Sequence, residues 1–190
     1  MTSLADPLLA DARRVLGAWE APSDRQADLR ARFLAFLDLH PDAACRAQRA
    51  GHLTASTVVL DDARERVLLT LHPVAGRWFQ LGGHLEAGDP SVAAAAAREA
   101  AEESGIAGLE MFAGPIGLDW HQVRCPDSAG LRGPSSHLDV EHVAVAPAGA
   151  RPSRSAESLD LAWFDLDALP PGTDEVVRGL VRRVRELGLA

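Results

Sequence analysis

The segment from Ser91 to Ser104 constrains the fold of this chain most strongly. Five consecutive alanines, Ala93 to Ala97, precede charged residues, and Gly105 follows the segment directly. Alanine has the highest helix propensity of the amino acids, and glycine ends many helices because it readily adopts the left-handed conformation. The sequence therefore predicts a helix over Ser91 to Ser104, with an alanine face and an acidic face.

Short β-branched runs surround this helix. Leu53 to Leu60 and Arg66 to Leu71 flank Asp61-Asp62-Ala63, a pattern typical of a β-hairpin, and a third run, Arg77 to Leu81, ends in Gly82-Gly83. Because the predicted strands and helices do not alternate regularly, we expect an α+β fold with a mixed β-sheet between helices. The remaining predicted elements are three strands, Met111 to Leu118, Leu138 to Ala146 and Leu161 to Phe164, and a closing amphipathic helix, Thr173 to Leu187.

The first part of the chain carries apolar residues at helical spacing between Leu4 and Leu39, with a candidate cap at Ser23 or Asp24. His40-Pro41 is a stop signal, since the residue before a proline avoids the α conformation. We therefore expect two short helices in an N-terminal helical extension, 1–48, followed by a main domain, 49–190. We expect the extension to pack on the main domain; a lid or a homodimer contact is the alternative.

The composition restricts the class of protein. Hydrophobic residues make up 47% and charged residues 24% of the 190 residues, close to the averages of globular domains. The sequence shows neither an early signal segment nor an apolar run of about 18 residues, so we expect a cytoplasmic protein with no membrane association. Cys45 and Cys125 lack metal-like spacing, and we expect free thiols.

The net charge restricts the partners. A formal net charge of −8 opposes binding to a nucleic-acid polymer or to an anionic membrane. An anionic small molecule would need a local counter-charge, either a bound metal or arginines, which are the only basic residues besides histidine in this sequence.

The acidic end of the predicted helix carries the chemistry. Residues three and four apart lie on one helix face, so Glu99, Glu102 and Glu103 present three carboxylates on one side. These like charges repel one another, and a divalent cation would turn the repulsion into coordination. Oxygen ligands favour Mg²⁺, with Mn²⁺ as a possible substitute. Arg98, four residues before Glu102, is placed to hold a carboxylate in position.

The stretch from Gly83 to Ile106 resembles the Nudix box, in which a glycine and a downstream acid precede Arg-Glu, an aliphatic residue, Glu-Glu, and a glycine followed by an aliphatic residue. The order and spacing match closely from Arg98 to Ile106. Two departures occur before the helix: the box has one extra residue, and the acid is Asp89 rather than glutamate. Capping of the helix, with Pro90 at its first position, is an equally good role for Asp89.

The resemblance implies a Nudix-like α/β/α sandwich and a Mg²⁺ site formed by Glu99, Glu102, Glu103 and the backbone carbonyl of Gly82. A further acidic ligand from a later loop is expected, and Glu157 is favoured over Glu141. The implied activity is metal-dependent hydrolysis of a phosphoanhydride bond in a nucleoside-diphosphate-linked or related small molecule, with attack of water at phosphorus. The alternative function is a non-catalytic ligand-binding module with the same fold. An isomerase of isoprenoid diphosphates, which needs a placed cysteine, is less favoured.

Several further residues are candidates for binding substrate. Arg77 and Trp78 precede the box, His84 lies within it, and Glu141 falls in the strand after a loop expected over Pro126 to Ser136. We expect the histidines His52, His72, His84 and His137 to be hydrogen-bonded or exposed side chains rather than ligands of a second metal, because their spacing matches no standard zinc motif.

Overall fold

The computed structural model describes residues 7–126 and 132–190. Four helices lie in these ranges: α1 (Pro7–Ala18), α2 (Asp24–Leu39), α3 (Val92–Ser104) and α4 (Glu175–Glu186). The strands are β1 (His52–Leu60), β2 (Arg66–Leu71), β3 (Trp78–Phe79), β4 (Leu81–His84), β5 (Glu110–Met111), β6 (Gly117–Pro126), β7 (Arg132–Val145) and β8 (Asp160–Asp165). None of the helices in the described ranges has the length and apolar character needed to cross a membrane.

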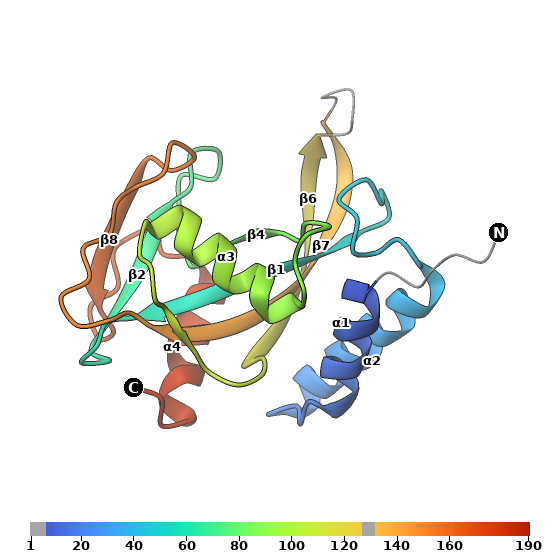
Figure 1. The fold of residues 1–190 in the computed structure, drawn as a ribbon, viewed down its shortest axis with the longest axis horizontal. Coiled ribbons are helices and arrows are strands. Elements are labelled where there is room, and N and C mark those ends of the chain that lie inside the picture. The colour runs from blue at the N-terminus through green and yellow to red at the C-terminus, as the bar shows by residue number, and fades with distance from the viewer. Residues whose placement is uncertain (1–6, 127–131) are drawn as a thin grey trace.

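The strands form one mixed sheet with β1 and β7 at its centre. β1 pairs with β7 in parallel and with β2 and β4 in antiparallel fashion, while β6 and β5 pair with β7 and β8 pairs with β2. Figure 1 shows α3 across one face of this sheet and α4 on the other side. The expected α/β/α sandwich with a mixed sheet is confirmed.

Side chains of β1 alternate between the two helical layers. Val59 packs in a cluster with Ala100 of α3, whereas Val58 and Leu60 pack with Val181 and other apolar residues of α4. This alternation follows from the two-residue period of a strand, and it explains why every residue of β1 is buried.

Helix α3 begins and ends as its sequence predicts. The Ser91 hydroxyl accepts a hydrogen bond from the N–H of Ala94 and caps the first turn, and Gly105 ends the helix with a φ of 66° in the left-handed region. Ala95, Ala96 and Ala100 are buried, and their small side chains bring the helix close to the sheet. At this contact the Thr57 hydroxyl of β1 donates to the carbonyl of Ala96 at 3.1 Å.

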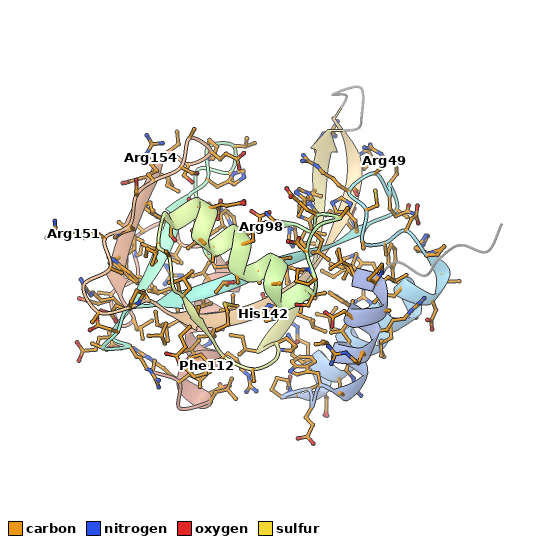
Figure 2. All side chains as sticks on the ribbon, in the orientation of Figure 1. Arg49, Arg98, Phe112, His142, Arg151 and Arg154 are labelled. Carbon is orange, nitrogen blue, oxygen red and sulfur yellow. The ribbon has the colours of Figure 1, made fainter. Side chains whose placement is uncertain are left out.

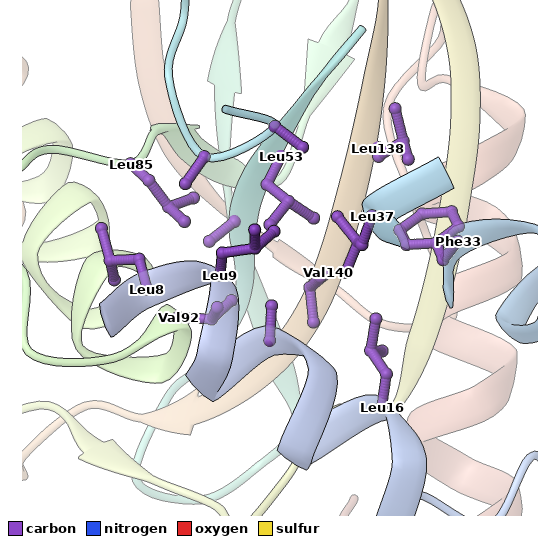
Figure 3. Packing of buried hydrophobic residues seen from close by; sticks show 14 of the residues in the cluster. Leu8, Leu9, Leu16, Phe33, Leu37, Leu53, Leu85, Val92, Leu138 and Val140 are labelled. Carbon is purple, nitrogen blue, oxygen red and sulfur yellow. The ribbon is translucent and has the colours of Figure 1, made fainter. Parts of the chain in front are cut away.

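The N-terminal helices share the core of the sheet. Phe33 and Leu37 of α2 lie in one apolar cluster with residues of α1, β1, β7 and α3 (Figure 3). The Gln26 side chain also donates to the carbonyl of Leu118 at 3.0 Å and accepts from its N–H at 2.9 Å, which fastens α2 to β6. The expected packing on the main domain is therefore observed, while the boundary at residue 48 stays a prediction.

Three expected elements differ from the structure. The extended run expected over Arg77 to Leu81 is divided between β3, which ends at Phe79, and β4, which begins at Leu81 and continues through the two glycines. The strand expected over Met111 to Leu118 is wrong: β5 ends at Met111 and β6 begins at Gly117. Gly114, with a φ of 75°, and Pro115, which lacks an N–H, interrupt the run between them. The loop expected over 126–136 is also partly wrong, because β7 begins at Arg132 and pairs with the end of β6, while 127–131 lie outside the described residues.

We predict that Leu37→Ala destabilises the whole protein by about 2–5 kcal/mol, because it leaves a cavity in the shared core. Leu39→Ala on the same helix is the matched control, since the Leu39 side chain is 77% exposed, and it should change stability by less than about 0.5 kcal/mol. Urea denaturation followed by circular dichroism checks both variants. Separate unfolding of the N-terminal helices, with the remaining transition unchanged, would contradict the shared core.

Candidate functional site

The site is built around two glycines of β4 that bring its backbone close to its neighbours. A Cβ atom on Gly82 would lie 2.6 Å from the Cα of Ser56 on β1, and a Cβ atom on Gly83 would lie 2.6 Å from the carboxyl carbon of Glu99 on α3. Both distances are far below van der Waals contact. Glycine at position 82 lets β4 lie against the backbone of β1, and glycine at position 83 leaves room for the Glu99 carboxylate at the acidic end of α3.

The Glu103 carboxylate binds the backbone of this strand. Its Oε2 atom accepts a hydrogen bond from the Gly82 N–H at 2.9 Å. Burial raises the pKa of Glu103 to about 7, and the charges of Glu99 and Glu157 add to this rise, while the Gly82 N–H opposes it. Near neutral pH the metal-free protein therefore holds this carboxyl group partly protonated.

Arg98, on α3 (Figure 2), holds several acidic side chains together. Its guanidinium donates two hydrogen bonds to Asp89, at 2.9 and 3.0 Å, one to Glu99 at 3.0 Å, and one to Glu102 at 3.1 Å. It also donates to the backbone carbonyl of His84 at 3.0 Å. One arginine thus connects the loop before α3, the end of β4 and two carboxylates of the helix.

The role of Asp89 corrects one alternative raised by the sequence. Asp89 does not cap α3, because Ser91 does. The Asp89 carboxylate instead accepts from both Arg98 and the Glu86 N–H, and these hydrogen bonds, with Arg98 the largest contributor, lower its pKa despite its burial. These hydrogen bonds close the loop before α3, from Glu86 to Asp89.

Glu99 and Glu102 differ in their surroundings. Burial raises the pKa of Glu99, although Arg98 opposes the rise. The Glu102 side chain is 60% exposed and extends to Arg98. The three glutamates therefore share one helix face without converging on a single point, and Glu99 and Glu103 form its half-buried part.

Glu157 lies near this buried pair. It sits in the loop before β8, and its charge raises the pKa of both Glu99 and Glu103. The same loop is fastened to the end of α3, because the Ser153 N–H donates to the carbonyl of Ser104 at 2.7 Å. Four carboxylates with one arginine among them form a donor set suited to a hard divalent cation.

Glu141 lies on the opposite face of the sheet, in register with the site. Gly82, Ser56, Glu141 and Gly117 are successive partners across β4, β1, β7 and β6. Glu141 is 4% exposed, burial raises its pKa well above the ordinary value, and its Oε1 atom has no hydrogen-bond partner among the described residues. It borders a pocket of about 350 Å³ whose other lining residues include Arg25, Arg182 and Arg183.

Arg77 and Trp78 contact a different part of the molecule. Arg77 donates to the Asp174 carboxylate at 3.1 Å, at the start of α4. The Trp78 ring packs edge to face on Phe164, with centroids 4.8 Å apart, and belongs to the apolar cluster under α4. The structure thus gives Trp78 a core contact and Arg77 an ion pair, and a role in binding substrate stays a prediction for both.

The structure brings together three histidines whose spacing in the sequence gave no metal motif. The ligand nitrogens of His52, His84 and His137 lie within 4.8 Å of one another. His72 lies apart from them and accepts from the N–H groups of Val74 and Ala75 in its own turn. The sequence signal that could have revealed the cluster was the alternation of His137, Asp139 and Glu141 along one face of β7.

A family comparison decides the class of protein. The model of the NUDIX domain matches residues 51–184, which is more than half of the chain. The chain belongs to the Nudix family. The prediction of a Nudix-type pyrophosphohydrolase agrees with this match, and the arginine and the glutamates of the Nudix box are the residues described above. No curated protein matches the chain.

Solved Nudix structures share the fold of this chain. A Nudix-family hydrolase from Clostridium perfringens is 22% identical, with a TM-score of 0.53, over 72% of this chain and 97% of that one. An Ap4A hydrolase from C. elegans is 20% identical, with a TM-score of 0.52, over 72% and 97%. The dihydroneopterin triphosphate pyrophosphohydrolase of E. coli is 16% identical, with a TM-score of 0.51, over 73% and 96%.

We predict that Gly82→Ala and Gly83→Ala differ in their effect on stability. The added methyl group of Gly82→Ala meets the backbone of β1, which cannot move, and we expect a loss on the order of 1–3 kcal/mol. The added methyl group of Gly83→Ala meets the Glu99 carboxylate, which can rotate away, and we expect a loss of stability below about 1 kcal/mol. Urea denaturation measures both, and equal losses would show that β4 is not held against β1 in this way.

We predict that Glu103→Gln stabilises the metal-free Nudix protein above neutral pH. Between the ordinary pKa of 4.5 and the folded value of about 7, the folded protein binds a proton that the unfolded chain has released, so stability falls as pH rises through this window. Glutamine keeps an oxygen for the Gly82 N–H but carries no charge. In chelator at about pH 8 we expect a gain on the order of 1–3 kcal/mol, which shrinks toward about pH 5.

Urea denaturation at the two pH values measures this difference. Glu110→Gln is the control, since Glu110 is exposed on β5. A loss of stability in Glu103→Gln that is the same at both pH values would contradict the account of Glu103.

Proposed function

We propose that this chain is a metal-dependent Nudix hydrolase that cleaves a phosphoanhydride bond in a nucleoside-diphosphate-linked or related small molecule, by attack of water at phosphorus. The single observation that carries the proposal is the burial of Glu99 and Glu103 against Gly82 and Gly83. A purely structural helix gains nothing from placing these carboxylates together, because the charge of Glu99 raises the pKa of Glu103, and the charges of Glu102 and Glu157 raise the pKa of Glu99.

Glu99, Glu103 and the backbone carbonyl of Gly82 would hold the catalytic cation, with Glu102 and Glu157 completing the oxygen ligands. Carboxylate and carbonyl oxygens are the donors that Mg²⁺ prefers, and Mn²⁺ accepts the same set. When bound, such a cation neutralises charge on a diphosphate and lowers the pKa of a coordinated water.

The residues around the cation would orient its carboxylate ligands and accept a proton. Arg98 fixes the rotamers of Glu99 and Glu102 through its hydrogen bonds, and Asp89 fixes Arg98. The Glu102 side chain is far more exposed than that of Glu99, and both bind Arg98. Glu102 is therefore our candidate for accepting the proton of the attacking water.

The pocket beside Glu141, on the face of the sheet away from α3, is the proposed substrate side. Glu141 stands two strands from Gly82 in the same register row, and strands in a sheet lie about 4.8 Å apart, so the backbones of these two residues lie roughly 10 Å apart. The arginines of the pocket suit an anionic ligand. Among the structural relatives, one acts on Ap4A and another on dihydroneopterin triphosphate, and we propose the same broad class of phosphoanhydride substrates here.

The proposal predicts Mg²⁺-dependent release of nucleotide or phosphate from a panel of dinucleoside polyphosphates, sugar nucleotides and nucleoside triphosphates. Glu103→Gln and Glu99→Gln should each lower kcat/KM by more than about 100-fold, because each removes a proposed ligand of the cation. Glu110→Gln should retain wild-type turnover.

The same panel separates the enzyme from the alternative function. Tight binding of one compound without turnover, in the presence of Mg²⁺ or Mn²⁺, would favour a non-catalytic ligand-binding module. Turnover that survives in folded Glu103→Gln would remove that residue from the proposed site.

A further inference from the structure

A row of histidines crosses three neighbouring strands beyond the carboxylate site. His52 of β1, His137 of β7 and His121 of β6 are successive register partners, so their side chains point to the same face of the sheet. His84, at the end of β4, stands opposite Thr54, two residues along β1 from His52. The ring centroids of His52, His84 and His137 lie 5.0 to 5.1 Å from one another.

Two of these rings bury a nitrogen atom that has no hydrogen-bond partner in the described part of the chain. The Nδ1 atom of His52 lies 3.3 Å from the carbonyl of Gln48, which can only accept, so Nδ1 carries the proton and Nε2 carries a lone pair. His52 is completely buried, and its Nε2 atom and that of His84 have no hydrogen-bond partner among the described residues. Burying such polar atoms without partners costs free energy.

This arrangement is the one that a metal-binding histidine adopts. A ligating imidazole usually donates its other N–H to a carbonyl or a carboxylate, which fixes the tautomer and aims the lone pair at the ion. His52 does this with Gln48, and His121 has its Nδ1 atom 2.6 Å from the Asp119 carboxylate. His121 also lies beside His137, with centroids 5.4 Å apart.

We propose that His52, His84 and His137 bind one divalent cation of the zinc class, at a site separate from the carboxylates of the Nudix box, with His121, whose ring lies beside that of His137, as the candidate for a fourth ligand. Imidazole nitrogens suit Zn²⁺, Co²⁺ and Ni²⁺ and are poor ligands for Mg²⁺.

The distances between the ligand nitrogens would fit a bound ion after a small movement of the imidazole rings toward one another. Zn–N bonds of about 2.0–2.1 Å in a tetrahedral site place the nitrogens roughly 3.3 Å apart. Since the three ligand atoms lie within 4.8 Å of one another, rotation of the rings would have to shorten the longest separation by roughly 1.5 Å. His84 and His137 are half-buried, so the ion can enter from solvent.

The site would connect to the box through His84. Its ring faces the other histidines, and its backbone carbonyl accepts from Arg98, the residue that holds Glu99 and Glu102. A bound ion would therefore join the end of β4 to β1 and β7 and fix the turn from which Arg98 is positioned. This inference stands on the histidines and does not depend on the proposed hydrolase activity.

Metal binding to the full-length protein tests the proposal. Protein stripped with chelator and titrated with ZnCl₂ should bind one ion per chain at this site by equilibrium dialysis and calorimetry. His84→Gln and His137→Gln should each weaken this binding by more than about 10-fold. His40→Gln removes a histidine outside the cluster, at the end of α2, and should bind zinc like the wild type.

A second variant separates the two candidate metal sites. Glu99→Gln combined with Glu103→Gln should keep the zinc site, whereas loss of zinc binding in this double variant and not in the histidine variants would place the ion at the box and overturn the proposal. Zinc should also raise the Tm of the wild type and not that of His137→Gln, since only the folded wild type offers the site.

A measurement on the wild type alone guards against variants that fail to fold. X-ray absorption at the zinc edge should show at least three imidazole ligands at about 2.0 Å. A spectrum with oxygen ligands alone, or no stoichiometric zinc, would overturn the proposal.

Discussion

The hydrogen bond from the Gly82 N–H to the Glu103 carboxylate joins the sheet to the acidic helix, and the rest of the site depends on it. It forms because Gly82 lies directly on the backbone of β1, where no side chain would fit. It also needs the alanines of α3, whose small side chains let the helix approach the sheet. The strand, the helix and the acids are thus placed by backbone contact rather than by long flexible side chains.

The charges gathered at this contact argue against a purely structural role for it. Glu99 and Glu103 are half-buried side by side, Glu157 adds a third charge, and Arg98 already binds Asp89, Glu99 and Glu102. Such repulsion between carboxylates lowers the stability of the fold. It is common at sites that bind ions or perform catalysis. A cation at this place would relieve the repulsion and would itself be held by it.

The sequence predicted the parts of this molecule that depend on neighbours along the chain. The alanine run and Gly105 predicted α3, the Asp61-Asp62-Ala63 turn predicted the first hairpin, and the order of residues from Arg98 to Ile106 predicted the family. Each of these signals is local, because helix propensity, turn residues and the spacing of acids on one helix face need no knowledge of the fold.

The sequence could not predict features created by pairing between distant strands. His52 meets His137 only because β1 and β7 pair in parallel, and no spacing in the chain encodes that register. The length of the β6–β7 hairpin was missed because a polar segment gains its strand conformation from its partner. Asp89 was read as a possible cap since its true partner, Arg98, lies nine residues ahead and reaches back across the turn.

Anomalous scattering from crystals soaked with Mn²⁺ tests the central claim most directly, because it locates the ion without reference to activity. The account predicts a manganese peak bounded by Glu99, Glu103 and the carbonyl of Gly82, with the two carboxylates turned toward it. Crystals in which those side chains keep their metal-free positions and the only peak lies among the histidines, or in which no peak is found, would contradict it.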